Sequence, residues 1–100
     1  QIPVRAKNST HVFHQYTLRI TNGKRDALME HLLANQIPCA IYYPIPLHSQ
    51  KAYADARYKE EDFPVTNQLV KEVISLPMHT ELDDEQINYI TSTVLAFFEK

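Results

Sequence analysis

Apolar and polar side chains alternate between residues 11 and 20, and this is the first regular pattern in the chain. A period of two is typical of a strand with one buried face. One face of this segment would carry Val12, His14, Tyr16, Leu18 and Ile20. Two later runs, at 38–43 and 74–76, are short, apolar and bounded by prolines. The pattern therefore predicts three short strands.

Helical spacing of apolar residues marks three further segments. Leu28 and Leu32, and likewise Met29 and Leu33, are four residues apart, which predicts an amphipathic helix over residues 24–35. A second helix is predicted from Pro64, because proline is favoured in the first turn. A third is predicted over residues 83–98, where Asp83 and Gln86 have the spacing of a capping box.

The order of these elements indicates an α+β fold, in which helices cover one face of a small three-stranded sheet. Residues 1–10 show no periodicity, so we expect an extended lead-in from a preceding part of a longer protein, followed by one domain over residues 11–100. The chain has neither a signal-peptide pattern nor a membrane-length apolar run. We expect a cytoplasmic protein without a membrane partner.

Charge and composition argue against several functions. The 10 Lys and Arg residues are interspersed with 12 Asp and Glu residues, so no basic stripe indicates a nucleic-acid partner. A chain with one glycine cannot form a Gly-rich phosphate loop. The single cysteine, Cys39, lies in an apolar run, which indicates a buried and inert thiol.

Five histidines raise the question of a metal site. His11 and His14 are an odd number of residues apart on the predicted strand, so their side chains should point to opposite faces. The other three lie in separate segments. We expect no metal site.

The segment after the second predicted strand combines a stiff backbone with polar side chains. Pro44 and Pro46 exclude regular hydrogen bonding, and a short helical stretch is predicted over residues 50–57. The polar and aromatic members are Tyr42, Tyr43, His48, Ser49, Gln50, Lys51 and Tyr53. These residues either form the rim of a ligand site, or the prolines only end a strand and His48 makes a local hydrogen bond. The residues alone leave both readings open.

Three motifs, in order, resemble the C-terminal part of the DegT/StrS-type (DegT/DnrJ/StrS) sugar-nucleotide aminotransferases. They are HQYT within residues 11–20, YYPIPLHSQ within residues 25–53 and EVISLPMH within residues 62–86. Each is weak alone, but their order and spacing together are specific. The combination is most similar to the enzymes that act on UDP-linked 3-keto-hexuronic acids.

The resemblance implies the small C-terminal domain of a fold-type-I aminotransferase. Such an enzyme works as a homodimer and moves an amino group, usually from glutamate, to a nucleotide-linked keto sugar for surface polysaccharide or amino-sugar biosynthesis. Its pyridoxal phosphate (PLP) would be bound by a large N-terminal domain, which supplies the Schiff-base lysine and the acidic partner of the pyridine nitrogen. Neither motif is present here, so we expect no catalytic or cofactor-binding residue in this chain, and no activity from it alone.

The resemblance also implies substrate-binding residues at two motifs. The candidates are His14, Tyr16, Tyr43, His48 and Gln50. One position departs from the family, because Gln36 stands where relatives usually end the first helix with glycine. If that position is left-handed, a non-glycine residue costs on the order of 1 kcal/mol.

Two other functions stay open at this point. The chain could be a free-standing small module that binds a ligand or protein in a regulatory role, or a segment that only completes the core and dimer surface of an enzyme. An upstream sequence with alternating strands and helices and a Schiff-base lysine would favour the aminotransferase.

Overall fold

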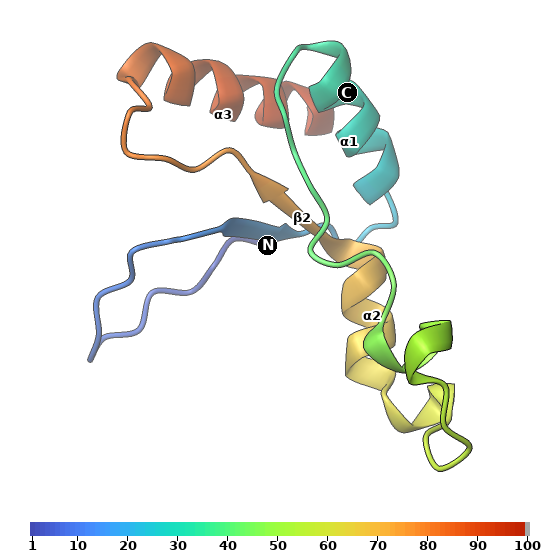
Figure 1. Cartoon of the computed structure of the whole chain (residues 1–100). Helices are drawn as coiled ribbons and strands as arrows, with labels where there is room; N and C mark the ends of the chain where they lie inside the picture. The colour runs from blue at the N-terminus through green and yellow to red at the C-terminus, as the bar shows by residue number, and fades with distance from the viewer. Residues whose placement is uncertain (100) are drawn as a thin grey trace.

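The computed structural model describes residues 1–99 and has two layers. Its elements are β1 (Tyr16–Arg19), α1 (Arg25–Ala34), α2 (Pro64–Glu72), β2 (Val73–Leu76) and α3 (Asp84–Phe98), with 3₁₀ turns at Leu47–Ser49, Lys51–Tyr53 and Glu60–Asp62. Helices α1 and α3 lie on one face of the β1–β2 ribbon, whereas α2 extends away from it (Figure 1). No helix within residues 1–99 is long and apolar enough to cross a membrane.

The sheet of the described residues is an antiparallel pair, with β1 beside β2. Leu18 pairs with Ile74, and both side chains are buried on the face that α1 and α3 cover. On the opposite face the hydroxyls of Thr17 and Ser75 are 2.8 Å apart, within hydrogen-bond distance. The lead-in also reaches the sheet, because Gln1 makes two backbone hydrogen bonds with Arg19 at the outer edge of β1.

The predicted third strand, over residues 38–43, is wrong. Only Ala40 bridges to β2, through two backbone hydrogen bonds with Ser75 of 3.1 and 2.7 Å. In an antiparallel ladder the next hydrogen-bonded pair would join Pro38 to Pro77, and neither residue has an N–H to donate. The bridge therefore cannot extend in that direction.

The predicted strand over residues 11–20 is too long. The observed strand begins at Tyr16, because β2 offers only four partners and Phe13 has a φ of 48°, which interrupts an extended chain. The argument that placed His11 and His14 on opposite faces of a strand is therefore wrong, since both residues precede β1.

The core lies between the ribbon and the two helices that cover it. Leu28, Leu32 and Ile74 are completely buried. Around them pack Leu18, Ile20 and Ile37, with Ile90, Val94 and Phe97 contributed by α3. The predicted packing of two helices on one face is thus confirmed, although Ile87, expected in the same stripe of α3, is 43% exposed.

The start of α3 follows its sequence signal. At the start of α3 the Gln86 N–H donates to Asp83 Oδ1 at 2.7 Å, and the Asp83 N–H donates to Gln86 Oε1 at 3.1 Å. The predicted capping box is therefore confirmed.

The predicted short helix over residues 50–57, in contrast, is reduced to the single 3₁₀ turn Lys51–Tyr53.

Helix α1 ends in a left-handed residue that is not glycine. Gln36 has a φ of 59°. Its N–H donates to the carbonyl of Leu33 at 3.0 Å, and the N–H of Ile37 donates to the carbonyl of Leu32 at 2.9 Å. This is the hydrogen-bond pattern of a Schellman motif, in which glycine is the preferred residue at the position that Gln36 occupies.

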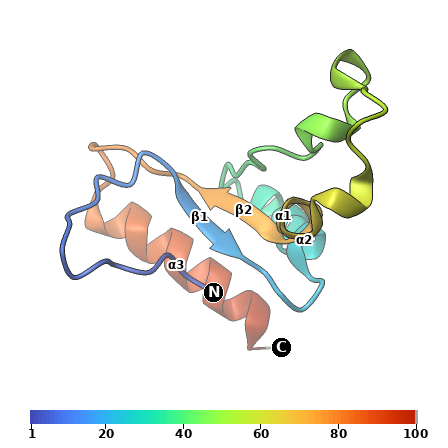
Figure 2. The ribbon, with the colours of Figure 1, turned by 90° about the horizontal axis from the view of Figure 1, so that it is seen from below.

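Residues 42–72, which we call the arm, project from this core (Figure 2). Arg25 ties the arm to α1, since its Nη1 donates to the carbonyls of Val70 and Val73, each at 3.0 Å. Arg19 of β1 makes an ion pair of 2.7 Å with Glu72 at the end of α2. Hydrogen bonds from Gln68 and then from Arg19 lower the pKa of Glu72 from its ordinary value of 4.5.

Replacing Gln36 with glycine should stabilise the chain. Gln36→Gly removes the strain of a left-handed non-glycine residue and should raise the free energy of unfolding by about 1 kcal/mol. The control Ala34→Gly, at a helical position, should lower it by about 1 kcal/mol. Urea unfolding followed by circular dichroism measures both, and a loss of stability in Gln36→Gly would contradict the strain argument.

The ion pair of Glu72 should make stability depend on acid pH. Because its pKa is lowered in the folded state, Glu72 contributes stability above the unfolded value of 4.5, and this contribution is lost as the pH falls through the folded pKa. Glu72→Gln should therefore lower the melting temperature at pH 7 and lower it less at pH 3. Glu30→Gln, at an exposed position of α1, is the control. Its effect on the melting temperature should not differ in this way between pH 7 and pH 3.

Candidate functional site

His48 is held from two sides, by Phe63 just before α2 and by Asn67 within it. It lies in the 3₁₀ turn Leu47–Ser49 and is half-buried. Its ring stacks on Phe63 with a centroid distance of 4.4 Å and an interplanar angle of 18°. Its Nε2 lies 3.0 Å from Asn67 Oδ1. One ring nitrogen is therefore engaged inside the chain, so a ligand could reach His48 only through the other.

The loop that carries His48 is built from consecutive tight turns. Pro46 precedes the first turn with a φ of −59°, which suits a proline ring. The N–H of Ser49 donates to the carbonyl of Pro46 at 3.0 Å, and that of Gln50 donates to Leu47 at 3.1 Å. The second turn follows directly, and in it the N–H of Tyr53 donates to the carbonyl of Gln50 at 2.9 Å. These backbone hydrogen bonds therefore fix the positions from which the side chains of the loop extend.

Tyr43 and Gln50 share one shallow hollow, together with Lys51. The Tyr43 side chain is 72% exposed. The amide of Gln50 reaches the carbonyl of Ile45 only at 3.5 Å, the limit of a hydrogen bond. These two polar side chains are thus free to meet a ligand at little cost in internal bonds.

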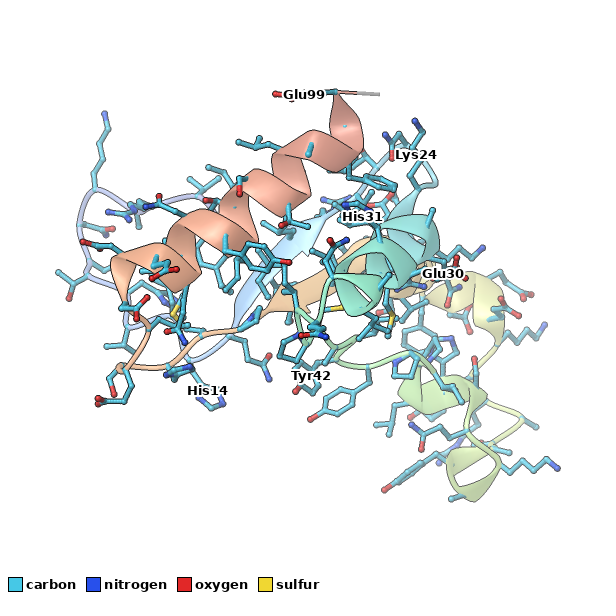
Figure 3. All side chains as sticks on the ribbon, turned by 90° about the horizontal axis from the view of Figure 1, so that it is seen from above. His14, Lys24, Glu30, His31, Tyr42 and Glu99 are labelled. Carbon is cyan, nitrogen blue, oxygen red and sulfur yellow. The ribbon has the colours of Figure 1, made fainter. Side chains whose placement is uncertain are left out.

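His14 lies at a different hollow, where the residues just before β1 meet the end of β2. That hollow is lined by Pro38, Cys39, Ser75 and Met78, and by Tyr42 from the base of the arm. Figure 3 shows His14 and Tyr42 on the same side of the molecule, opposite the C-terminal end of α3. Burial raises the pKa of the Cys39 thiol, which disfavours the thiolate.

Tyr16 does not join either group of residues. It is the first residue of β1 and pairs with Leu76 on the face that the core covers. Its ring packs on that of Phe13 at a centroid distance of 5.3 Å. The structure therefore brings Tyr43 and Gln50 together, and it places His14, Tyr16 and His48 at three other locations.

Two residues at His48 were not among the sequence candidates, namely Phe63 and Asn67. They are four residues apart, so the first turn of α2 presents them on one side. The sequence did offer one signal, an aromatic residue just before a predicted helix and an amide four residues later within it. Only the fold places this pair beside the loop.

The model of the DegT/DnrJ/EryC1/StrS aminotransferase family matches residues 1–95 of the chain. The chain belongs to this family. A solved structure, that of S. venezuelae DesV in complex with a ketimine intermediate, aligns with a TM-score of 0.89 and 31% identity. The alignment covers 99% of this chain and 26% of that one.

Three curated relatives show how this family member compares in sequence. A pleiotropic regulatory protein of Geobacillus stearothermophilus is 43% identical over 88% of this chain and 23% of its own length. The UDP-N-acetyl-3-dehydro-alpha-D-glucosamine 3-aminotransferase of Acidithiobacillus ferrooxidans is 42% identical over 94% and 24%. The UDP-2-acetamido-2-deoxy-3-oxo-D-glucuronate aminotransferase of Pseudomonas aeruginosa is 39% identical over 87% and 23%. The chain thus spans about a quarter of the length of these relatives.

The lysines of this family member do not fit the cofactor of the family. A lysine that forms a Schiff base reacts as a neutral amine, a state that desolvation or a nearby cation favours. The described lysines are all exposed, at positions 7, 24, 51, 59 and 71. Lys51 lies nearest to the candidate residues, in an open hollow beside Tyr43.

The isolated chain should therefore form no specific adduct with PLP. After incubation with PLP and reduction with borohydride, mass spectrometry should find only scattered, substoichiometric labelling of lysines, because none is set apart by burial. A single lysine labelled at one equivalent would contradict this expectation. Free N-acetyl-lysine at the same concentration gives the baseline of non-specific reaction.

Proposed function

We propose that this chain is the C-terminal part of a PLP-dependent aminotransferase that moves an amino group from glutamate to a nucleotide-linked keto sugar. The observation that carries the proposal is the family match over residues 1–95, which includes the loop YYPIPLHSQ. The relatives from Acidithiobacillus and Pseudomonas are both named for UDP-linked sugars with an oxidised carbon 3. They support a UDP-3-keto sugar, and the second supports a hexuronic acid.

In this proposal the cofactor is held by the rest of the protein, and this chain serves the substrate side. PLP supplies the electron sink for amino transfer when bound. The loop at Tyr43, His48 and Gln50 then offers polar groups to the nucleotide sugar. His14 is a further candidate contact at the neighbouring hollow, whereas Tyr16 has less access because it packs toward the core.

The exposed surface of the arm is evidence for a large interface with more protein. Its exposed apolar side chains include Tyr43, Ile45, Leu47, Tyr53 and Tyr58. The radius of gyration is 15.9 Å, against about 13 Å for a compact domain of this length. An extended shape with aromatic residues on its projecting part is typical of a piece that packs against more protein. We propose that a large N-terminal domain and a second copy of the protein cover it.

The same surface argues against a free-standing regulatory module. The name of the Geobacillus relative refers to regulation, but that relative also extends far beyond the region it shares with this chain. A stand-alone domain would leave the aromatic side chains of the arm in water, which favours aggregation. The aminotransferase proposal accounts for that surface, and the module does not.

His48→Ala in the full-length enzyme should slow the half-reaction with the keto sugar. The loss of one substrate hydrogen bond should cost roughly 1 to 3 kcal/mol in that step, while PLP binding and the glutamate half-reaction stay nearly unchanged. Single-turnover kinetics of each half-reaction, normalised to folded and PLP-loaded enzyme, provide the measurement.

His79→Ala is the matched control, because His79 is an exposed histidine outside the arm. It should leave both half-reactions unchanged. If His48→Ala and Gln50→Ala both keep wild-type kinetics with the keto sugar, the loop is only a structural connection. A purely structural role would instead lower the melting temperature and depress both half-reactions together.

A further inference from the structure

The amide of Asn67 has an orientation that its surroundings determine. One end of this amide lies 2.6 Å from the backbone carbonyl of Glu60. A carbonyl oxygen can only accept a hydrogen bond, so this end must be the NH₂ group. The oxygen of the amide then faces the opposite way, toward His48.

This orientation determines which nitrogen of His48 carries a proton. The Asn67 oxygen lies 3.0 Å from His48 Nε2 and can only accept. His48 must therefore donate through Nε2–H, and in the neutral ring Nδ1 is the acceptor. Within residues 1–99, Nδ1 has no hydrogen-bond partner and is not buried away from solvent. It is the nitrogen left open for a ligand.

The plane of the ring is held by the same helical turn. Phe63 stacks on the imidazole at 4.4 Å and 18°, and it precedes Asn67 by four residues. Stacking limits tilting of the ring, and the hydrogen bond limits its rotation. One turn of α2 thus determines both where the ring lies and which tautomer it adopts.

We propose that Asn67 is a positioning residue, which holds His48 as the Nε2–H tautomer so that Nδ1 accepts a hydrogen bond from the nucleotide sugar. The inference rests on the proposed function of the loop. It also states the chemistry of the ligand group that is recognised. For the neutral ring, that group is a donor, such as a sugar hydroxyl or an N–H, and not a phosphate oxygen or a carboxylate.

Two amide substitutions at His48 separate the two ring nitrogens. The amide of His48→Asn overlies the position of Nδ1, so its oxygen can still accept from the ligand. The amide of His48→Gln overlies Nε2, so it can still donate to Asn67 but presents nothing at Nδ1. In the full-length, PLP-loaded enzyme the keto-sugar half-reaction should be roughly tenfold faster in the Asn variant than in the Gln variant.

A structural role for His48 predicts the reverse order, because His48→Gln preserves the bond to Asn67. If the Gln variant is as fast as the Asn variant or faster, the proposal is overturned.

Asn67→Leu tests the positioning role itself. It should slow the keto-sugar half-reaction by roughly tenfold and leave the glutamate half-reaction unchanged, because the imidazole can then adopt the wrong tautomer. In a His48→Asn background, Asn67→Leu should slow the keto-sugar half-reaction little, since an asparagine side chain has no ring tautomers. Equal losses in the two backgrounds would overturn the role. Asn88→Leu, at an exposed helical asparagine of α3, is the control and should change neither half-reaction.

A spectroscopic measurement tests the tautomer apart from the substrate role. Long-range ¹H–¹⁵N NMR of the deuterated full-length enzyme with ¹⁵N-labelled histidine distinguishes the two neutral tautomers, and His48→Gln identifies the signal. If His48→Ala and Gln50→Ala both leave the keto-sugar kinetics unchanged, the proposed function of the loop fails, whereas an Nε2–H pattern that is lost in Asn67→Leu still supports positioning by Asn67. An Nδ1–H pattern in the wild type overturns it.

Discussion

The pairing of four residues of β1 with four of β2 is the constraint on which the rest of this structure depends. It brings Leu18 against Ile74 and so creates the apolar face on which α1 and α3 pack. Helix α2 runs directly into β2, so the same pairing also sets the starting point of the arm. The core and the candidate site are therefore positioned by one short ribbon.

The arm depends on polar contacts at its base more than on burial. Arg25 caps the carbonyls of Val70 and Val73, and Glu72 pairs with Arg19, so the C-terminal end of α2 is held to both layers of the core. Further out, aromatic side chains are exposed. A projection of this kind can keep its internal geometry, with His48 against Phe63, while its outer surface remains available for more protein.

Local signals predicted α1, α2 and α3 well, and the strands and the short helix over residues 50–57 less well. A helix satisfies its own backbone, so the leucine spacing of α1 and the capping box of Asp83 were sufficient to locate α1 and α3. A strand exists only where a partner is within reach, and no periodicity reports that partner. The alternation over residues 11–20 therefore overestimated β1, and Pro38 opposite Pro77 reduced the third strand to the bridge at Ala40.

The sequence by itself determined the α+β class and the family, because the first follows from local periodicity and the second from an ordered set of motifs. The left-handed end of α1 was only a conditional expectation until the structure gave Gln36 a positive φ. Only the tertiary structure decided how the candidate residues are grouped. It placed Tyr43 with Gln50, set His14 at another hollow and enclosed one nitrogen of His48 with Asn67. The physical reason is that a side chain's role follows from what lies across from it, and Asn67 is 19 residues beyond His48 along the chain.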